Sequence, residues 1–189
     1  TTPRRSTQRA TASCWARACR RTAFCSGSSS AEAASHAASA RSRSCRGRRS
    51  RKTPEAVIHV YGADAWGWRG WFAIHTWIAV KGTGASSYTV YDVVGWRGYH
   101  NRQVMRIYQD LPDRHWYGAK PRLLRAHQGE GVDRLIAAVD RAARDYPWKN
   151  TYKAFPGPNS NTFVAWIALQ VPDLDVDLPI SAIGSGYAD

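Results

Sequence analysis

The chain has 189 residues, with 27 Lys and Arg against 14 Asp and Glu, and a formal charge of +13. Residues 1–52 hold 12 Arg, Lys52 and the single acid Glu32, so they carry 13 − 1 = +12 and residues 53–189 carry 14 − 13 = +1. No run approaches the roughly 18 consecutive apolar residues of a transmembrane helix. Residues 53–189 are therefore expected to form one near-neutral α+β domain without a membrane span or a basic nucleic-acid footprint.

The N-terminal segment is expected to be a disordered tail, because Arg, Ser and Ala make up 12 + 11 + 11 = 34 of residues 1–52. The composition also fits an organelle transit peptide or a basic segment that binds phosphates. A further interpretation is the translation of GC-rich DNA in a wrong frame, in which case the tail is not a genuine protein sequence. The four cysteines have spacings that match neither a paired zinc motif nor a compact disulfide framework: Cys14, Cys19, Cys25 and Cys45.

The sequence becomes typical of β-strands near residue 56. Four runs rich in β-branched and aromatic residues, each bounded by turn formers, predict strands over 56–61, 72–80, 87–94 and 103–108. A short loop with two glycines joins the second and third runs, which predicts an antiparallel hairpin. With a symmetric loop the paired positions sum to about 167, and His75 then lies opposite Asp92 on the same face, within side-chain reach.

Two helices follow the strands. Apolar residues recur at helical spacing from Gly131 to Tyr146, and a mostly apolar helix is expected over Thr162–Gln170. Strands first and helices after indicate an α+β fold with an antiparallel sheet of four or more strands and two main helices. The sequence has neither of the glycine-rich phosphate-binding motifs, and its histidines lack metal-site spacing, so no cofactor and no metal are predicted.

Two similar pieces flank the hairpin, Gly67–Trp71 and Gly95–Tyr99, and must emerge at the same end of it. Aromatic rings there can stack on a sugar, peptide or lipid head group, and guanidinium groups can bind a carboxylate or phosphate. This interpretation makes substrate-binding candidates of four residues: Trp68, Arg69, Trp96 and Arg97. The alternative is that the tryptophans fill the core and the glycines form turns.

The segment from Tyr152 to Phe163 places Ser160 at the start of a buried helix. Free N–H groups and the positive end of the helix dipole stabilise a developing oxyanion and activate a nucleophile there. The same residues also fit ordinary helix capping, since Asn and Ser are favoured caps. Tyr152, Asn159, His115 and Trp116 are further pocket candidates without defined roles. His75 is in the same way either a catalytic base or a hydrogen-bonded core residue.

Long motifs in residues 54–187, among them PEAVIHVYGADAWGWRGWFAIHTWIAVK and YPWKNTYKAFPGPNSNTFVAWIA, resemble an uncharacterised bacterial family known only as a domain of unknown function. Members of that family generally begin with a hydrophobic signal or membrane anchor. The resemblance therefore implies an envelope location, periplasmic or membrane-anchored. Here the Arg- and Ser-rich tail occupies that position.

A strand histidine followed by a Tyr…Asn-x-…-Phe helix start is also similar, more distantly, to circularly permuted papain-like hydrolases and acyltransferases, including the lecithin retinol acyltransferase type. The resemblance implies that Ser160 lies where that group has its cysteine, His75 where it has its base, and Asp92 where an orienting group lies. A serine hydroxyl is much less acidic than a thiol, so this arrangement requires a well-oriented base.

Two classes of function are expected from these observations. One is a papain-like hydrolase or acyltransferase acting on amide or ester bonds in the cell envelope, with Ser160, His75 and Asp92 as catalytic residues. The other is a non-catalytic module that binds a peptide, glycan or lipid through the Trp- and Arg-lined pocket.

Overall fold

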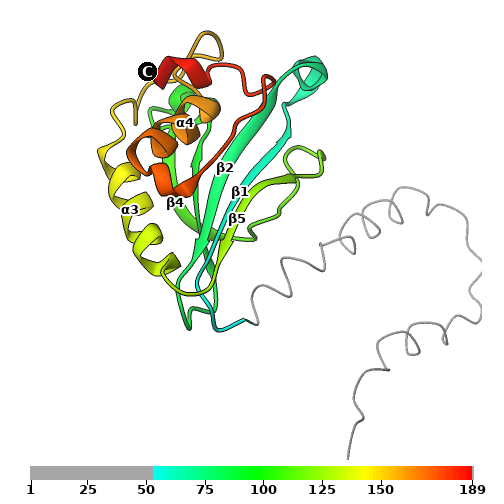
Figure 1. Ribbon diagram of the computed structural model, residues 1–189. Coiled ribbons are helices and arrows are strands. Elements are labelled where there is room, and N and C mark those ends of the chain that lie inside the picture. The colour runs from blue at the N-terminus through cyan, green and yellow to red at the C-terminus, as the bar shows by residue number, and fades with distance from the viewer. Residues whose placement is uncertain (1–52, 189) are drawn as a thin grey trace, which may run out of the picture. The chain divides into compact units, whose positions relative to one another are not determined.

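A five-stranded antiparallel sheet forms the centre of the computed structural model, which describes residues 53–188. Predictions for residues 1–52 lie outside the described residues. The strands are arranged in the order β4-β3-β2-β1-β5, and each neighbouring pair is antiparallel (Figure 1). They are β1 (Val57–Asp64), β2 (Ile74–Lys81), β3 (Tyr88–Val93), β4 (Met105–Asp110) and β5 (Arg122–Gln128).

Two α-helices follow the strands, α3 (Val132–Asp145) and α4 (Ser160–Gln170), which confirms the predicted α+β fold. Four short 3-10 helices complete the described elements: η1 (Gly67–Trp71), η2 (Gly95–His100), η3 (Pro172–Leu174) and η4 (Ser185–Ala188). The helix α4 begins two residues earlier than predicted, because Asn159 rather than a later residue caps it.

The sequence did not predict β5. This edge strand, RLLRAHQ, has no fully buried residue and contains two arginines and a histidine, so it lacks the β-branched run by which the other strands were recognised. The register of the β2–β3 hairpin was also predicted wrongly. Ile78 pairs with Tyr91, so paired positions sum to 169 rather than 167, and the ladder covers only Ile78–Val80 on β2.

The two faces of the sheet are covered differently. Residues such as Val60, Ile78 and Tyr91 pack against α3 and α4 in the larger core cluster. Side chains alternate between faces along a strand, so the next residues along β2 point to the other face, where Trp77 and Ala79 belong to a second cluster with Trp116. Trp116 comes from the connection between β4 and β5, and Trp77 Nε1 donates to the Pro112 carbonyl of that connection.

One end of the sheet carries both 3-10 helices that were recognised as repeated pieces. The first, η1, joins β1 to β2, and the second, η2, joins β3 to β4. Because β2 and β3 are antiparallel, the start of β2 and the end of β3 lie at this end, as the sequence predicted. The start of α4 also lies here, since the Asn161 side chain donates to the Ile74 carbonyl at the start of β2.

Candidate functional site

The start of α4 is fixed by a neutral hydrogen-bond network. Asn159 Oδ1 accepts from the N–H groups of Asn161 and Thr162, at 2.9 and 3.1 Å, and the Thr162 hydroxyl accepts from the Asn159 N–H. These contacts form a capping box. The amide nitrogen of Asn159 donates to the carbonyls of Ala154 and Ile183. Both polar groups of Asn159 are therefore engaged within the protein, which gives this predicted substrate contact a capping role.

A glycine makes this network possible. Gly184 has φ +91, in the region that favours glycine, and a Cβ there would collide with the Asn159 side chain. The Gly184 carbonyl accepts from the Thr162 hydroxyl at 2.6 Å. The C-terminal segment thus holds the first turn of α4 by a close backbone approach.

Thr76 connects β2 to this helix start. Its hydroxyl lies 3.2 Å from the Ser160 carbonyl and 2.9 Å from Asn161 Oδ1. Ser160 is 4 % exposed, and neither its hydroxyl nor its N–H has a hydrogen-bond partner among residues 53–188. Thr76, the residue after His75, therefore fixes the backbone carbonyl of Ser160, the predicted nucleophile. The hydroxyl and the N–H of Ser160 are not used by these contacts.

His75 and Asp92 form a buried pair. His75 Nε2 lies 2.9 Å from Asp92 Oδ1, although the two residues are not directly opposite in the ladder. The predicted proximity is confirmed, and it arises diagonally across the part of β2 that β3 no longer pairs with. The indole of Trp116 stacks on the imidazole of His75 with ring centroids 3.5 Å apart and planes at 4°. This stacking fixes the orientation of the imidazole.

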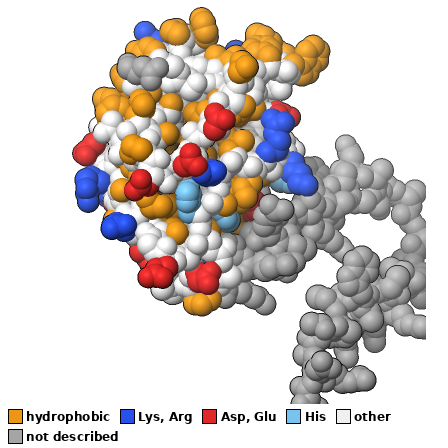
Figure 2. Space-filling view, in the orientation of Figure 1, with side chains coloured by type: hydrophobic (Ala, Val, Ile, Leu, Met, Phe, Trp, Pro, Cys, Tyr) orange, Lys and Arg blue, Asp and Glu red, His pale blue; other side chains and the backbone are white. Residues whose placement is uncertain are grey.

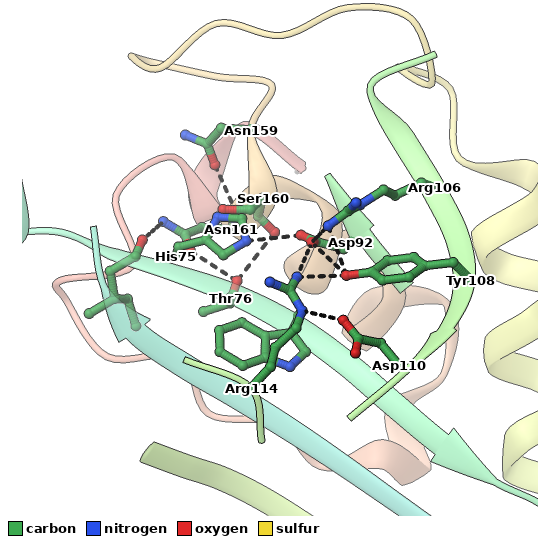
Figure 3. A network of polar contacts seen from close by, with 12 residues as sticks. His75, Thr76, Asp92, Arg106, Tyr108, Asp110, Arg114, Asn159, Ser160 and Asn161 are labelled. Carbon is green, nitrogen blue, oxygen red and sulfur yellow. Dashed lines mark hydrogen bonds and ion pairs between the residues drawn. The ribbon is translucent and has the colours of Figure 1, made fainter. Parts of the chain in front are cut away.

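Two arginines and a tyrosine converge on the other oxygen of the Asp92 carboxylate (Figure 3). Arg114 and Arg106 each donate through Nη2 to Asp92 Oδ2, at 2.8 and 3.0 Å. Both also donate to the Tyr108 hydroxyl, at 2.6 and 2.8 Å, and that hydroxyl lies 3.4 Å from Asp92 Oδ2. Asp110 adds an ion pair with Arg114.

These partners decide the charge of the site. Burial alone would raise the pKa of Asp92, but the charge that His75 carries when it is protonated, the hydrogen bond with His75 and the charges of Arg114 and Arg106 hold that pKa well below its ordinary value. Burial, with the Asp92 charge adding to it, raises the pKa of Tyr108 to about 12. Asp92 is therefore an anion and Tyr108 a neutral phenol across the physiological range.

The ionised carboxylate assigns the tautomer of His75. A carboxylate can only accept a hydrogen bond, so the neutral imidazole carries its proton on Nε2 and leaves a lone pair on Nδ1. Within the part of the chain that the structure describes, Nδ1 has no hydrogen-bond partner. His75 is thus an oriented base with one free nitrogen.

The structure brings His75 and Asp92 together but does not join them to Ser160. No hydrogen bond links the Ser160 hydroxyl to His75 in residues 53–188, and alternation along β2 directs Thr76, rather than His75, toward the face that α4 covers. The expected oxyanion site is also reduced. Two of its N–H groups, those of Asn161 and Thr162, are used by the cap, and the N–H of Ser160 remains.

A cavity of about 210 Å³ opens beside the Asp92 cluster, lined by Trp96, Arg106, Arg114, Trp116 and Tyr117. Two of these line it with guanidinium groups and three with aromatic rings. Of the predicted binding residues, Trp96 lines this cavity. Tyr152 lies close by, since its ring packs against the backbone of Gly95, and burial raises its pKa, with Arg69 opposing and Asp92 adding to the effect.

The other predicted binding residues lie outside the cavity wall. Trp68 is exposed on η1, with the Arg69 guanidinium 5.1 Å from the centre of its ring. Arg97 on η2 donates to the Gln103 carbonyl. The interpretation that the tryptophans fill the core holds for Trp77 but not for the exposed tryptophans of η1 and η2.

Sequence reasoning missed the residues that surround Asp92. Arg106, Tyr108 and Asp110 lie at alternate positions on β4, and Arg114 follows in the connection to β5, whereas Trp116, a predicted pocket candidate, lines the cavity. Alternating charged and aromatic residues on one strand face was the available signal, but it also fits a solvated edge strand. Among residues 53–188 no group of His, Cys, Asp and Glu side chains is arranged to hold a metal ion, and no helix there has the length and apolar character to cross a membrane.

Comparison with known proteins gives one match. The family described as "Protein of unknown function (DUF3750)" matches residues 55–187, which is more than half of the chain. No curated protein and no solved structure matches the chain.

Proposed function

The chain belongs to the DUF3750 family, and we propose that it is a hydrolase or acyltransferase that acts on amide or ester bonds. Ser160 is the nucleophile, His75 the general base and Asp92 the residue that orients the imidazole. The observation that carries the proposal is the buried His75–Asp92 pair, in which Nδ1 of His75 has no hydrogen-bond partner. Thr76, the next residue along β2, contacts the Ser160 carbonyl.

The reaction has two stages. His75 Nδ1 takes the proton of the Ser160 hydroxyl while the oxygen attacks the carbonyl carbon, and the Ser160 N–H donates to the resulting oxyanion. His75 then gives that proton to the leaving nitrogen or oxygen as the acyl bond breaks. Water, or a second acyl acceptor, next attacks the acyl-serine with His75 again as base, which restores the free hydroxyl.

Electrostatics supports the role of Asp92. Its carboxylate is fully buried, stays ionised and stabilises the imidazolium that forms when His75 takes a proton. The Ser160 hydroxyl and His75 Nδ1 are not hydrogen-bonded in the structure, and His75 points to the face of β2 opposite to Thr76, so the proposal requires the imidazole to turn toward the helix start when substrate binds. Catalytic hydrogen bonds often shorten on going from the free enzyme to the complex.

The cavity supplies the substrate side of the proposal. Trp96, with Tyr152 beside it, offers ring faces for stacking, and Arg69 and Arg97 lie on the neighbouring 3-10 helices. A papain-like arrangement and a bacterial envelope location belong to the same proposal and rest on the family resemblance of the sequence motifs.

Labelling by a serine-reactive fluorophosphonate tests the catalytic proposal. We expect the full chain to be labelled, and Ser160→Ala and His75→Gln each to abolish the labelling. Ser86→Ala provides the matched control, because Ser86 is exposed in the turn between β2 and β3 at the opposite end of the sheet. Labelling that survives Ser160→Ala would show that the nucleophile is another residue.

A binding module without catalysis is the second candidate. The specific observation that favours it is the cavity with two guanidinium groups and three aromatic rings, together with the missing contact between Ser160 and His75. A bound ligand stabilises the native state. A ligand screen by thermal shift separates the two functions, because stabilisation that survives Ser160→Ala, without any probe labelling of the parent chain, supports the binding module.

A further inference from the structure

One end of the described domain exposes an unusual number of large aromatic side chains. Trp71 is 91 % and Tyr99 is 89 % exposed. Four more rings have at least half of their surface exposed, three from the loop of η1 and one from the connection between β4 and β5: Trp66, Trp68, Phe72 and Tyr117. Scattered exposed apolar residues are ordinary, but a group of them indicates an interaction surface. We name this group the aromatic end.

The topology places these side chains together. η1 and η2 lie at the same end of the sheet because β2 and β3 are antiparallel. Tyr117 joins them, since its ring centroid lies 6.0 Å from that of Trp66. The loop of the fully exposed Ile180 also reaches this end, because the Ser181 carbonyl accepts from the Ile74 N–H. Figure 2 shows hydrophobic side chains along the upper end of the molecule, and acidic ones across the middle of this face and at the lower end.

The charged side chains on and next to η1 and η2 are basic, and the acidic Asp64 at the end of β1 is paired with Arg122. Arg69, Arg97 and Arg102 lie on or next to η1 and η2, and within residues 53–188 none of them has a carboxylate partner. Between residues 65 and 109 the sequence has a single acid, Asp92, which is fully buried. The arginines at this surface are therefore free to pair with an external anion.

We propose that the aromatic end docks on a bilayer that contains anionic lipid. Trp and Tyr rings favour the interfacial region of a membrane, where an apolar body and a polar group are both accommodated. The arginines would lie at the level of the phosphates, where each basic residue adds attraction to an anionic surface. Rings spread over two 3-10 helices and the connection between β4 and β5 suit insertion into a fluid interface better than the flat complementary contact of a rigid protein partner.

Docking in this way has a consequence for the site. The cavity wall includes Trp96 of η2 and Tyr117 of the aromatic end. A docked molecule therefore presents its cavity to the lipid surface. The docking proposal is nevertheless independent of catalysis, because it involves neither Ser160 nor His75.

Vesicle flotation with the full chain tests the proposal, using phosphatidylcholine vesicles with and without phosphatidylglycerol. Interfacial binding scales with the apolar area buried, so the double variant Trp71→Ala, Tyr99→Ala should partition at least about tenfold more weakly. The matched control is Ile107→Ala, Leu169→Ala, which removes two exposed apolar side chains outside the aromatic end. The control should partition like the parent chain.

A second pair of variants tests the charge. Arg69→Gln with Arg97→Gln should weaken binding to phosphatidylglycerol vesicles by roughly fivefold for each arginine. Arg134→Gln with Arg141→Gln, both exposed on α3, should not. Residues 1–52 carry the same charge in every variant, so the differences report the aromatic end. Thermal melting by circular dichroism checks that each variant stays folded.

Equal partitioning of the parent chain and the aromatic variant would overturn the proposal, because the attraction would then come from residues 1–52. Equal weakening by the aromatic variant and its apolar control would overturn it too. A protein partner that is lost with the aromatic variant, while vesicle binding is unchanged, would assign the surface to that partner instead.

Discussion

Two polar networks lie on either side of β2 and differ in charge and in how fully their hydrogen-bond donors and acceptors are used. The network at the start of α4 is neutral, and Asn159, Asn161 and Thr162 use nearly all their donors and acceptors within the protein. The network around Asp92 is charged, contains two arginines and leaves His75 Nδ1 without a partner. Thr76 belongs to the neutral network, and His75, its neighbour on β2, belongs to the charged one.

This difference indicates that one network has a structural role and the other a chemical one. The neutral network leaves few hydrogen-bond donors and acceptors for a ligand, because the protein itself uses them, and it rigidifies the start of α4. A buried carboxylate held by three cations or donors is costly unless it is used, since apolar packing of the same volume is often as stable. The His75–Asp92 side therefore carries the stronger argument for function, and the Asn159 side positions Ser160.

The largest effect is expected for Asp92→Asn. This change removes the negative charge between two arginines that keep their own charges in a partly buried site. Breaking a buried ion pair by removing one partner costs about 3–5 kcal/mol. We expect a loss of this order in the free energy of unfolding, measured by urea denaturation at neutral pH.

Asp110→Asn provides the control for this prediction. Asp110 also pairs with Arg114, but its side chain is partly exposed. An exposed ion pair contributes about 1 kcal/mol or less, so this variant should be much closer to the parent chain. Equal losses in the two variants would mean that the buried position of Asp92 has no special weight.

The pH dependence of stability gives the next effect. The pKa of Asp92 is lower in the folded protein than its ordinary value, which is about 3.9 in an unfolded chain. The unfolded state therefore binds the proton first, and the stabilisation is present above about pH 4 and is lost as the pH falls further. Urea denaturation between neutral and acid pH should show the gap between the parent chain and Asp92→Asn closing below about pH 4. A gap that stays constant there would contradict an ionised Asp92.

A smaller effect is expected on the neutral side. Asn159→Ala removes the cap of α4 and leaves the N–H groups of Asn161 and Thr162 without an acceptor. Loss of an N-cap costs about 0.5–2 kcal/mol, and the buried position favours the upper part of that range. Asn150→Ala, at an exposed position, is the matched control. In thermal denaturation, the midpoint of unfolding should be lower than that of the parent chain for Asn159→Ala and unchanged for Asn150→Ala.

The sequence predicted the neutral network better than the charged one. The cap at Asn159 has a local signature, a polar residue followed by a hydroxyl at the third helical position, so a few neighbouring residues identify it. The His75–Asp92 contact was also predicted, because a short hairpin brings its two strands together even when the register is wrong by two residues.

Arg106 and Arg114 were not predicted to contact Asp92. Arg106 lies directly opposite Asp92 in the ladder between β3 and β4, so it could have been found by pairing these two predicted strands. The approach of Arg114 to Asp92 and the stacking of Trp116 on His75 depend on the path of the connection between β4 and β5 across the sheet, and no local pattern specifies that path. Whether the η1 tryptophans are exposed or buried was left open for a related reason. Composition favours burial of tryptophan, and only the fold shows that these loops extend beyond the covered part of the sheet.

The smallest effect tests whether the two networks act independently. Thr76→Val removes a hydroxyl that donates to the Ser160 carbonyl and to Asn161, at nearly unchanged volume, which should cost about 1 kcal/mol. Because Thr76 and His75 point to opposite faces, the losses from Thr76→Val and His75→Gln should add within about 0.5 kcal/mol in the free protein. In the proposed mechanism Ser160 and His75 meet only when substrate is bound. A lower rate of probe labelling in Thr76→Val, in which His75 is intact, would therefore place the catalytic contact at the meeting point of the two networks, whereas an unchanged rate would leave Thr76 as a structural residue alone.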